Sequence, residues 1–287
     1  MKAVIEAGSA DSTAARMLSE PAPDGGVALW WLGQAGFALR ARGVRLLIDP
    51  YLSDWLEHKY AGTSLPHPRL LPTPLRPDQP CDLDAVLCSH AHGDHLDPWT
   101  VTPLAAANPA CRFIVPRAAV EQAVAMPLDP QRIVGLNDGE GFELPGCTVQ
   151  AVAAAHEQLE VNDRGEHLFL GYLLRLGNLT IYHSGDCVDY PHLAERLAGE
   201  RIDLALLPVN GRGKSTSEFS VLGNFTLDEA VGLCRRAGIG QMIAHHYGMF
   251  DFNTVDVREL SRQVEHLDAG GLVLLPTADR AYVVRAG

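Results

Sequence analysis

Residues 89–97 read Ser89-His90-Ala91-His92-Gly93-Asp94-His95-Leu96-Asp97. They follow directly on an apolar run that begins at Ala85. We expect residues 85–89 to form a buried strand. In an extended segment, side chains two positions apart face the same side, so the imidazoles of His90 and His92 can reach one ion. Asp94 and His95 follow where the chain turns towards a helix, and they can reach a second ion. The spacing of these four residues predicts a metal site.

Three further candidate ligands each follow an expected strand: His156 after 148–154, Asp186 after 179–183, and His246 after 241–245. Strand ends on one edge of a sheet converge, so we expect these residues to meet the histidine cluster. On spacing alone, His245 is an alternative to His246. The alternative interpretation is a surface histidine cluster without chemistry, and the spacing of three histidines and an aspartate argues against it. A closed structural zinc site is usually rich in thiolates, and no cysteine here has suitable spacing.

The composition is that of a globular protein. The chain has 287 residues, of which 47% are hydrophobic and 20% are charged, so it can bury a sizeable core. Lys and Arg number 23 and Asp and Glu number 35, which gives a net charge of −12. We expect no nucleic-acid partner, because a phosphate backbone attracts a basic surface.

We also expect no stable membrane insertion. No apolar run approaches the roughly 18 residues that a membrane span needs, and the first 20 residues lack the apolar segment of a secretory signal. The six cysteines are scattered without a CxxC pair, which favours reduced thiols. These features together predict a cytoplasmic protein.

The expected elements mix strands with single helices. Strands are expected at 27–32, 36–40, 44–48, 85–89, 111–115, 148–154, 168–176, 179–183, 204–209, 241–245, 272–275 and 281–285. Helices are expected at 98–107, with Asp97 as its N-cap, and at 117–125, 190–198, 226–237 and 254–267. Two mixed sheets with helices on their outer faces fit this count, which is an α+β fold. We expect one domain at 26–287 after an N-terminal extension at 1–25, with a short helix at 11–19.

Residues 66–80 contain six prolines, so they cannot form a regular helix or a central strand. A long irregular loop of this kind is often functional. Together with Trp55, His58, Lys59 and Tyr60, it could form a lid over a site. It could equally pack as an ordinary surface loop.

The order and spacing of these motifs resemble the metallo-β-lactamase superfamily over nearly the whole chain. The segments 30–33, 84–87, 182–186 and 202–206 are similar to its L-ascorbate-6-phosphate lactonase-like branch. The segment His246-Tyr247-Gly248-Met249-Phe250 is also similar to N-acyl-phosphatidylethanolamine phospholipase D. The resemblance implies an αββα sandwich with a metal site along one edge. The Tyr-Gly-x-Phe pattern after His246 favours His246 over His245 as the ligand.

The resemblance also implies a set of ligands. One metal ion would be held by His90, His92 and His156, the other by Asp94, His95 and His246, with Asp186 bridging. Asp49 ends its strand in the segment Ile48-Asp49-Pro50. It would orient a metal ligand by a hydrogen bond without binding the metal itself. Its alternative role is to close the strand.

These ligands suit one or two divalent ions, with zinc the default of the superfamily and manganese implied by the lactonase resemblance. A divalent metal lowers the pKa of a bound water from about 16 to about 7, which provides hydroxide at neutral pH. Asp94 would be the catalytic residue that accepts or delivers the proton. No serine or cysteine nucleophile is then needed.

Substrate contacts are expected from two places. The segment Asn210-Gly211-Arg212-Gly213-Lys214 follows the strand 204–209. Basic residues flanked by glycines at a strand end suit an anionic group. An exposed polar loop is the alternative interpretation. Gln34 and Tyr247 are also candidates to line the pocket.

The sequence predicts a metal-dependent hydrolase that opens a lactone, either sugar-acid-like or another cyclic ester. A phosphodiesterase of the phospholipase D type is the first alternative, and a non-catalytic metal-binding scaffold is the second. The expected partner is a small-molecule substrate. The sequence leaves open whether the chain forms a homo-oligomer.

Overall fold

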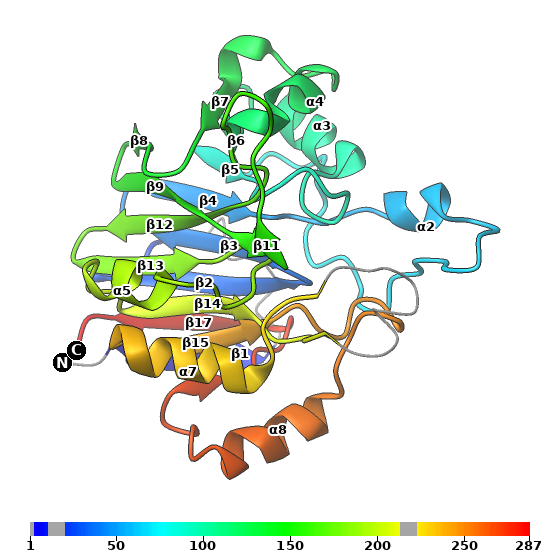
Figure 1. Cartoon of the computed structure of the whole chain (residues 1–287). Helices are drawn as coiled ribbons and strands as arrows, with labels where there is room; N and C mark the ends of the chain where they lie inside the picture. Colours follow the sequence, from blue (N-terminus) through cyan, green and yellow to red (C-terminus); the bar gives the residue numbers. More distant parts are fainter. Residues whose placement is uncertain (1–2, 11–20, 213–222) are drawn as a thin grey trace.

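Two β-sheets packed face to face, with helices on both outer faces, make up the molecule (Figure 1). The computed structural model of the chain describes residues 3–10, 21–212 and 223–287. The layer order is helix, sheet, sheet, helix, and each sheet mixes parallel and antiparallel pairs. The expected αββα sandwich is therefore confirmed.

The first sheet has eight strands in the order β1-β17-β2-β3-β4-β5-β6-β7. Their bounds are β1 (Val4–Ala10), β17 (Arg280–Arg285), β2 (Gly26–Gly33), β3 (Gly36–Ala41), β4 (Val44–Ile48), β5 (Ala85–Leu87), β6 (Arg112–Pro116) and β7 (Ile133–Leu136). The strands β2, β3 and β4 form an antiparallel meander, whereas β4 to β7 pair in parallel. Parallel pairing brings the loops that follow β4 and β5 to the same sheet edge.

The second sheet has seven strands in the order β16-β15-β14-β13-β12-β9-β8. Their bounds are β16 (Val273–Leu274), β15 (Met242–His245), β14 (Leu204–Pro208), β13 (Leu179–His183), β12 (Leu170–Leu176), β9 (Cys147–Ala153) and β8 (Gly141–Leu144). A separate two-stranded pair is formed by β10 (Ala155–His156) and β11 (Gln158–Leu159). The strands β13 to β16 are parallel, so their carboxyl ends share one edge.

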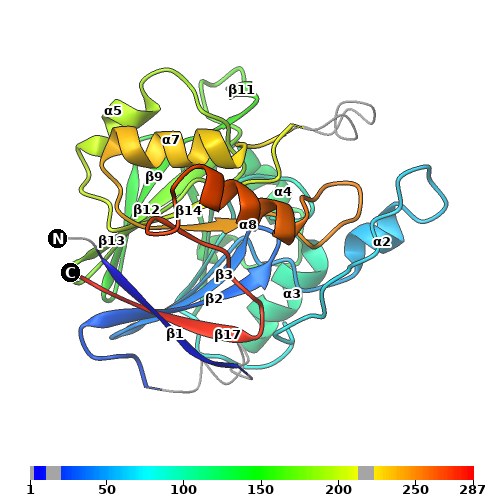
Figure 2. The same ribbon diagram turned by 90° about the horizontal axis from the view of Figure 1, so that it is seen from below.

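The helices are α2 (Trp55–Lys59), α3 (Pro98–Ala107), α4 (Val120–Val124), α5 (Leu193–Ala198), α7 (Leu227–Ala237) and α8 (Val257–His266), with two 3₁₀ turns, η1 (Arg117–Ala119) and η2 (Pro130–Arg132). Asp97 caps α3 by accepting a hydrogen bond from the backbone N–H of Trp99. Figures 1 and 2 show α5, α7 and α8 beside the second sheet, with α3 and α4 beside the first. Within the described residues, no helix has the length and apolar character needed to cross a membrane.

The N-terminus differs from the expectation. Residues 4–10, placed in an extension outside the domain, form β1 and pair antiparallel with β17. This strand covers backbone groups of β17 that would otherwise form a sheet edge. Its sequence, VIEAGSA, has no apolar alternation, which is why the pattern gave no sign of a strand. The helix expected at 11–19 lies outside the described residues.

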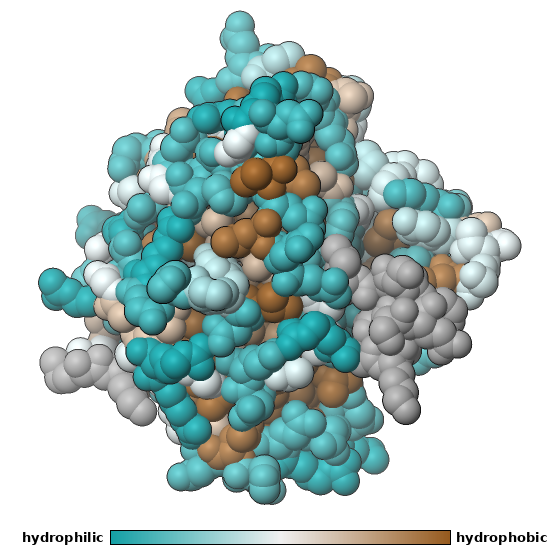
Figure 3. Space-filling view, viewed as in Figure 1, coloured by the Kyte–Doolittle hydropathy of each residue, from teal (hydrophilic) through white to brown (hydrophobic). Residues whose placement is uncertain are grey.

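The core has three parts. The largest fills the space between the sheets and continues under α5, α7 and α8, and a second lies between the first sheet and α3. A small third cluster joins Tyr51, Leu56, Met249 and Phe250 near α2. On the face shown in Figure 3, hydrophobic residues form small patches surrounded by hydrophilic ones.

The proline-rich segment 66–80 has no helix or strand, as expected. It is held against the body of the protein, because the backbone N–H of Leu70 donates to the carbonyl of Met249 at 2.9 Å. The buried side chain of Arg69 donates from Nη1 to the carbonyl of Tyr51 at 2.8 Å. These contacts favour the packed loop over the lid.

Candidate metal centre

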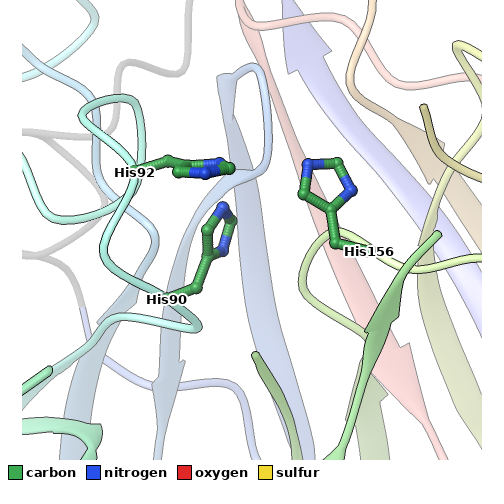
Figure 4. Close-up of side chains that lie close together, drawn as sticks. All are labelled: His90, His92 and His156. Atoms are coloured by element: carbon green, nitrogen blue, oxygen red, sulfur yellow. The ribbon is translucent and has the colours of Figure 1, made fainter. Parts of the chain in front are cut away.

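Three histidines from two separate segments meet at the ends of the sheets (Figure 4). His90 and His92 lie on the loop after β5, and His156 lies in β10. Their rings point toward one another, and each offers a nitrogen within 4.8 Å of the others. This is the first ligand set that the sequence predicts.

A second set joins Asp94, His95 and His246, whose ligand atoms also lie within 4.8 Å of one another. Asp94 Oδ2 lies 3.7 Å from His95 Nε2 and 3.9 Å from His246 Nε2. Asp94 and His95 belong to the motif after β5, whereas His246 follows β15. Each set therefore combines residues of the motif after β5 with a histidine that follows a strand of the second sheet, β9 or β15.

Asp186 lies between the two sets. Its Oδ2 atom is 3.1 Å from His246 Nε2, 3.4 Å from His95 Nε2 and 3.8 Å from His156 Nε2. Burial alone would raise the pKa of this carboxyl group, but the imidazoles of His246 and His95 hold it well below its usual range. Asp186 is therefore an anion in the position expected of a bridging ligand.

His246, and not His245, lies in the cluster. His246 adopts a left-handed backbone conformation, with φ of 67°, which turns it out of the strand. His245 stays in β15, where its ring stacks on His183 at 5.1 Å and meets the edge of Phe37. The structure thus agrees with the preference drawn from the Tyr-Gly-x-Phe pattern.

The residues present fit divalent ions. His90 Nε2 and Asp186 Oδ1 are buried and have no hydrogen-bond partner among the described residues, a condition that a cation would relieve. Burial lowers the pKa of His156 to about 4 and that of His90 well below its ordinary 6.5. Both rings are therefore neutral at pH 7, as a metal ligand must be.

Asp49 and Ser89 contact the Nδ1 atoms of two candidate ligand histidines. Asp49 Oδ2 lies 2.9 Å from His95 Nδ1, and Ser89 Oγ lies 2.9 Å from His90 Nδ1. The Ser89 hydroxyl also donates to Asp49 Oδ2 at 2.7 Å. His156 Nδ1 lies 3.1 Å from the carbonyl of Gly223. Asp49 thus contacts a ligand, as expected for a residue that orients it.

Two glycines allow the loops to pack this closely. A Cβ atom on Gly93 would lie 2.2 Å from Cζ3 of Trp55, so α2 rests directly on the metal motif. Gly185 has φ of 61°, and its Cβ would lie 2.6 Å from both the Leu170 carbonyl oxygen and Ser89 Cβ. Glycine at these positions keeps Asp186 close to the motif after β5.

Gln34 contacts the ligands directly. Its Nε2 atom donates to Asp94 Oδ2 at 2.9 Å and lies 3.2 Å from His246 Nε2. Its backbone carbonyl accepts a hydrogen bond from the N–H of His246. The side chain is fully buried, so it positions ligands and does not line an open pocket.

The structure does not bring the other expected substrate residues to the cluster. Arg212 pairs with Glu229 and donates from Nη1 to the Asn224 carbonyl at 2.8 Å. Asn210 donates to the side chain of Asn253 at 2.7 Å. Tyr247 packs in the core, 5% exposed, and its hydroxyl donates to the carbonyl of Pro276. Gly213 and Lys214, also part of the expected anion site, lie outside the described residues.

A cleft of about 660 Å³ opens over the metal cluster. It is lined by Trp55, Leu56, Lys59, Tyr60, Leu65, His67, Ala91, His92, Gly93, Asp94, Gln122, His156, Asp186, Phe250, Phe252 and Asn253. Sequence reasoning missed Phe250, Phe252, Gln122 and Asn253 as lining residues. The aromatic run 250–252 beside His246 is the signal that could have found two of them.

The cysteines do not offer a nucleophile. None of the six forms a disulfide in the structure. Cys187 follows Asp186 in the chain, but burial raises the pKa of its thiol to about 12. A thiol of that pKa is protonated at neutral pH.

An αββα sandwich with two histidine–aspartate sets at its strand ends defines a class of metal-dependent hydrolases. The family described as the beta-lactamase superfamily domain matches residues 44–247, and the chain belongs to this metallo-β-lactamase superfamily. The histidine motif at 90–95 and its resemblance to this superfamily predict the membership correctly.

Two relatives and one solved structure illustrate the similarity. The chain is 27% identical over 252 residues to a UPF0173 metal-dependent hydrolase of Rubrobacter xylanophilus, which covers 85% of this chain and 90% of that protein. It is 26% identical over 246 residues to N-acyl-phosphatidylethanolamine-hydrolyzing phospholipase D 1 of Caenorhabditis elegans, covering 81% and 67% respectively. Igni18, a metallo hydrolase of Ignicoccus hospitalis, shares the fold with a TM-score of 0.64 at 19% identity, covering 91% and 100%.

Proposed function

We propose that this metal-dependent hydrolase opens a lactone, either sugar-acid-like or another cyclic ester. The observation that carries the proposal is the pair of ligand sets around Asp186 at a cleft of about 660 Å³. This volume suits a small molecule. The attack would require no side-chain nucleophile.

His90, His92 and His156 would hold one ion and Asp94, His95 and His246 the other, with Asp186 between them. When bound, such ions polarise the scissile carbonyl group and lower the pKa of water enough for attack at neutral pH. Imidazole and carboxylate ligands suit zinc and manganese, which are the ions we propose.

Asp94 is the residue that we propose moves the proton. Gln34 Nε2 fixes its Oδ2 atom at 2.9 Å. Its other oxygen, Oδ1, would accept a proton from the attacking water and return it to the alkoxide oxygen that leaves the opened ring. Gln34 would keep the carboxylate in the orientation that this transfer needs.

Cleavage of a phosphodiester by a phospholipase D type reaction is the second candidate. The similarity to the nematode phospholipase D favours it, and so do the aromatic residues that line the cleft. Binding to a lipid surface needs a larger apolar area than the small hydrophobic patches on the one face that Figure 3 shows.

The test compares lactones with bis(p-nitrophenyl) phosphate, using protein stripped by a chelator and reloaded with Mn²⁺ or Zn²⁺. We expect metal-dependent lactone opening to exceed phosphodiester cleavage. The opposite order would favour the phosphodiesterase. Turnover of neither compound by metal-loaded protein would favour the non-catalytic scaffold.

His92→Ala should abolish lactone opening and leave the fold intact, because His92 is a ligand at the surface of the cluster. The measurement is kcat after chelation and reloading, with circular dichroism as the check of folding. His58→Ala is the matched control, since His58 faces Trp99 and does not line the cleft. Full activity of the His92 variant would contradict the ligand assignment.

A further inference from the structure

Five ring-bearing side chains line the cleft beside the metal cluster, and we call them the aromatic wall: Trp55, Tyr60, His67, Phe250 and Phe252. They come from α2, from the loop that follows it and from the loop after β15. Trp55 rests on Gly93 of the metal motif. The wall therefore begins beside the candidate ligands, within reach of a group attached to the reacting bond.

Four rings of the wall contact one another in a row, from Tyr60 through His67 and Phe252 to Phe250. Tyr60 stacks on His67 with ring centroids 4.2 Å apart, and His67 meets Phe252 at 4.5 Å. Phe250 and Phe252 lie nearly parallel at 5.8 Å. Burial lowers the pKa of His67 below its ordinary 6.5, so this ring is neutral at pH 7. The faces of these rings suit contact with an aryl ring or an alkyl chain.

The fold holds this surface in place. Arg69, with a side chain only 5% exposed, donates to the carbonyl of Tyr51 and lies 4.9 Å from the centre of its ring. The Tyr51 ring packs in turn on Phe250 at 5.7 Å. The Leu70 N–H is bonded to the Met249 carbonyl. A surface fixed before the ligand arrives loses little conformational entropy on binding.

Apart from the candidate metal ligands, the described lining of the cleft carries a single charged side chain. Among the described residues that line it, Lys59 is the one lysine or arginine. Its Nζ lies 4.7 Å from the ring centre of Trp55 and 5.2 Å from that of Tyr60. Arg212, expected to bind an anion, is paired with Glu229 instead. The chemistry of the lining therefore favours a neutral, partly apolar ligand.

We propose that the aromatic wall binds an apolar substituent, an alkyl chain or an aryl ring, attached next to the ester bond that is cut. The substrate class is a neutral lactone that carries such a group. This inference rests on the proposed lactonase function. Of the two substrate classes proposed there, it selects the cyclic ester that is not sugar-acid-like and adds that this ester carries an apolar group. Tyr60 and Phe252 are then specificity-determining residues.

The test uses two neutral lactones with the same ring, γ-butyrolactone and γ-nonalactone, which differ by a pentyl group. Partial burial of that group should raise kcat/KM of the wild-type protein by about tenfold or more. In Phe252→Ala we expect the gain to fall below about threefold, and Phe252→Leu should keep most of it. Tyr60→Ala tests the other end of the wall.

Trp99→Ala is the matched control, because Trp99 is 48% exposed and lines a different surface hollow. It should keep the full wild-type gain. Equal kcat/KM for the two lactones in wild type would overturn the inference while leaving the lactonase function intact. An unchanged gain in both Phe252→Ala and Tyr60→Ala would also overturn it.

Binding of the lactam analogues, 2-pyrrolidinone and its 5-pentyl derivative, separates the inference from the proposed function, because lactams of this size resist hydrolysis. Calorimetry on metal-loaded protein should show the pentyl lactam binding about tenfold more tightly to wild type than to Phe252→Ala. If no lactone is opened but this difference persists, the lactonase function fails and the binding surface stands. Equal affinities for wild type and variant would overturn the inference.

Discussion

Asp49 is a single residue on which the geometry of His95 depends. It adopts a left-handed conformation with φ of 43°, which aspartate and asparagine tolerate better than most residues. Its Oδ1 accepts a hydrogen bond from the Ser89 N–H at 2.6 Å, and its Oδ2 faces the Ser89 hydroxyl and His95 Nδ1. Both oxygens must therefore act as acceptors.

Asp49→Asn should weaken metal binding about 10- to 100-fold, because one oxygen becomes an N–H₂ group that faces a donor. Asparagine keeps the size and the backbone conformation, so the fold should survive. Competition against a chromogenic chelator measures the affinity. Asp78→Asn, which changes an exposed carboxylate paired with Arg76, is the control. Equal affinities of Asp49→Asn and wild type would show that Asp49 only closes its strand.

Gly93→Ala should reduce kcat at least about tenfold. The added methyl group would lie 2.2 Å from Cζ3 of Trp55, so the motif and α2 must move apart. The melting temperature should change by a few degrees at most, because both segments lie at the surface of the cleft. Gly270→Ala is the control, since its Cβ would meet no atom within 4 Å. Wild-type kcat in Gly93→Ala would show that this contact does not position the ligands.

The clustering of the candidate ligands could be predicted from sequence because four of the seven lie in one short motif, and the other three follow recognisable strands. The pairing of Arg212 could not be predicted in the same way. Its partner, Glu229, is 17 residues away on the first turn of α7, and no local sequence pattern predicts that pairing. Gln34 was expected near the site, but only its contact with Asp94 reveals that it holds a ligand.

At the scale of elements, the buried strands were the most predictable part. The strands β13, β14 and β15 consist mainly of apolar residues, and all their positions except Thr180 are buried. The edge strands β1 and β8 were missed because half-exposed edges carry weaker patterns. Short α2 was missed since five residues provide too little periodicity. The contact of α2 with Gly93 results from tertiary packing, which the local sequence does not encode.

The ion pair between Asp138 and Arg196 ties the segment before β8 to α5. Asp138 lies 2.7 Å from Arg196 Nη2, and its Oδ1 accepts a hydrogen bond from the Ala153 N–H at 2.7 Å. Burial alone would raise the pKa of this carboxyl group, but Arg196 and the Ala153 N–H lower it below its ordinary 3.8. Because the folded pKa is the lower one, the stabilisation is complete above the ordinary value and is lost as the pH falls below it.

Asp138→Asn should therefore lower the melting temperature at pH 7 by roughly 2–4 °C, as about 1 kcal/mol predicts for a chain of this size. The difference from wild type should shrink as the pH is lowered below 4. Scanning calorimetry at a series of pH values measures it. Asp82→Asn, at an aspartate with an 86% exposed side chain, should show no such difference. If the difference in melting temperature between Asp138→Asn and wild type stays constant down to pH 3, the charge of Asp138 has no role in stability.

At the scale of the whole molecule, the metal cluster joins the two sheets. Four candidate ligands follow β5 of the first sheet. Asp186 and His246 follow β13 and β15 of the second, and His156 lies just after β9. A cation held by both groups crosslinks the layers at one edge. Unfolding must separate them, so metal binding and global stability are coupled.

Metal ions should therefore raise the melting temperature of the whole protein. At a free concentration about 1,000 times Kd, ligation contributes about 4 kcal/mol, which corresponds to roughly 8 °C or more. Calorimetry of chelator-treated protein with and without added Zn²⁺ or Mn²⁺ measures the shift. His156→Ala removes a ligand supplied by the second sheet, so the shift should fall by half or more, whereas His58→Ala should keep it. A full shift in His156→Ala would mean that His156 is not one of the ligands through which an ion joins the sheets.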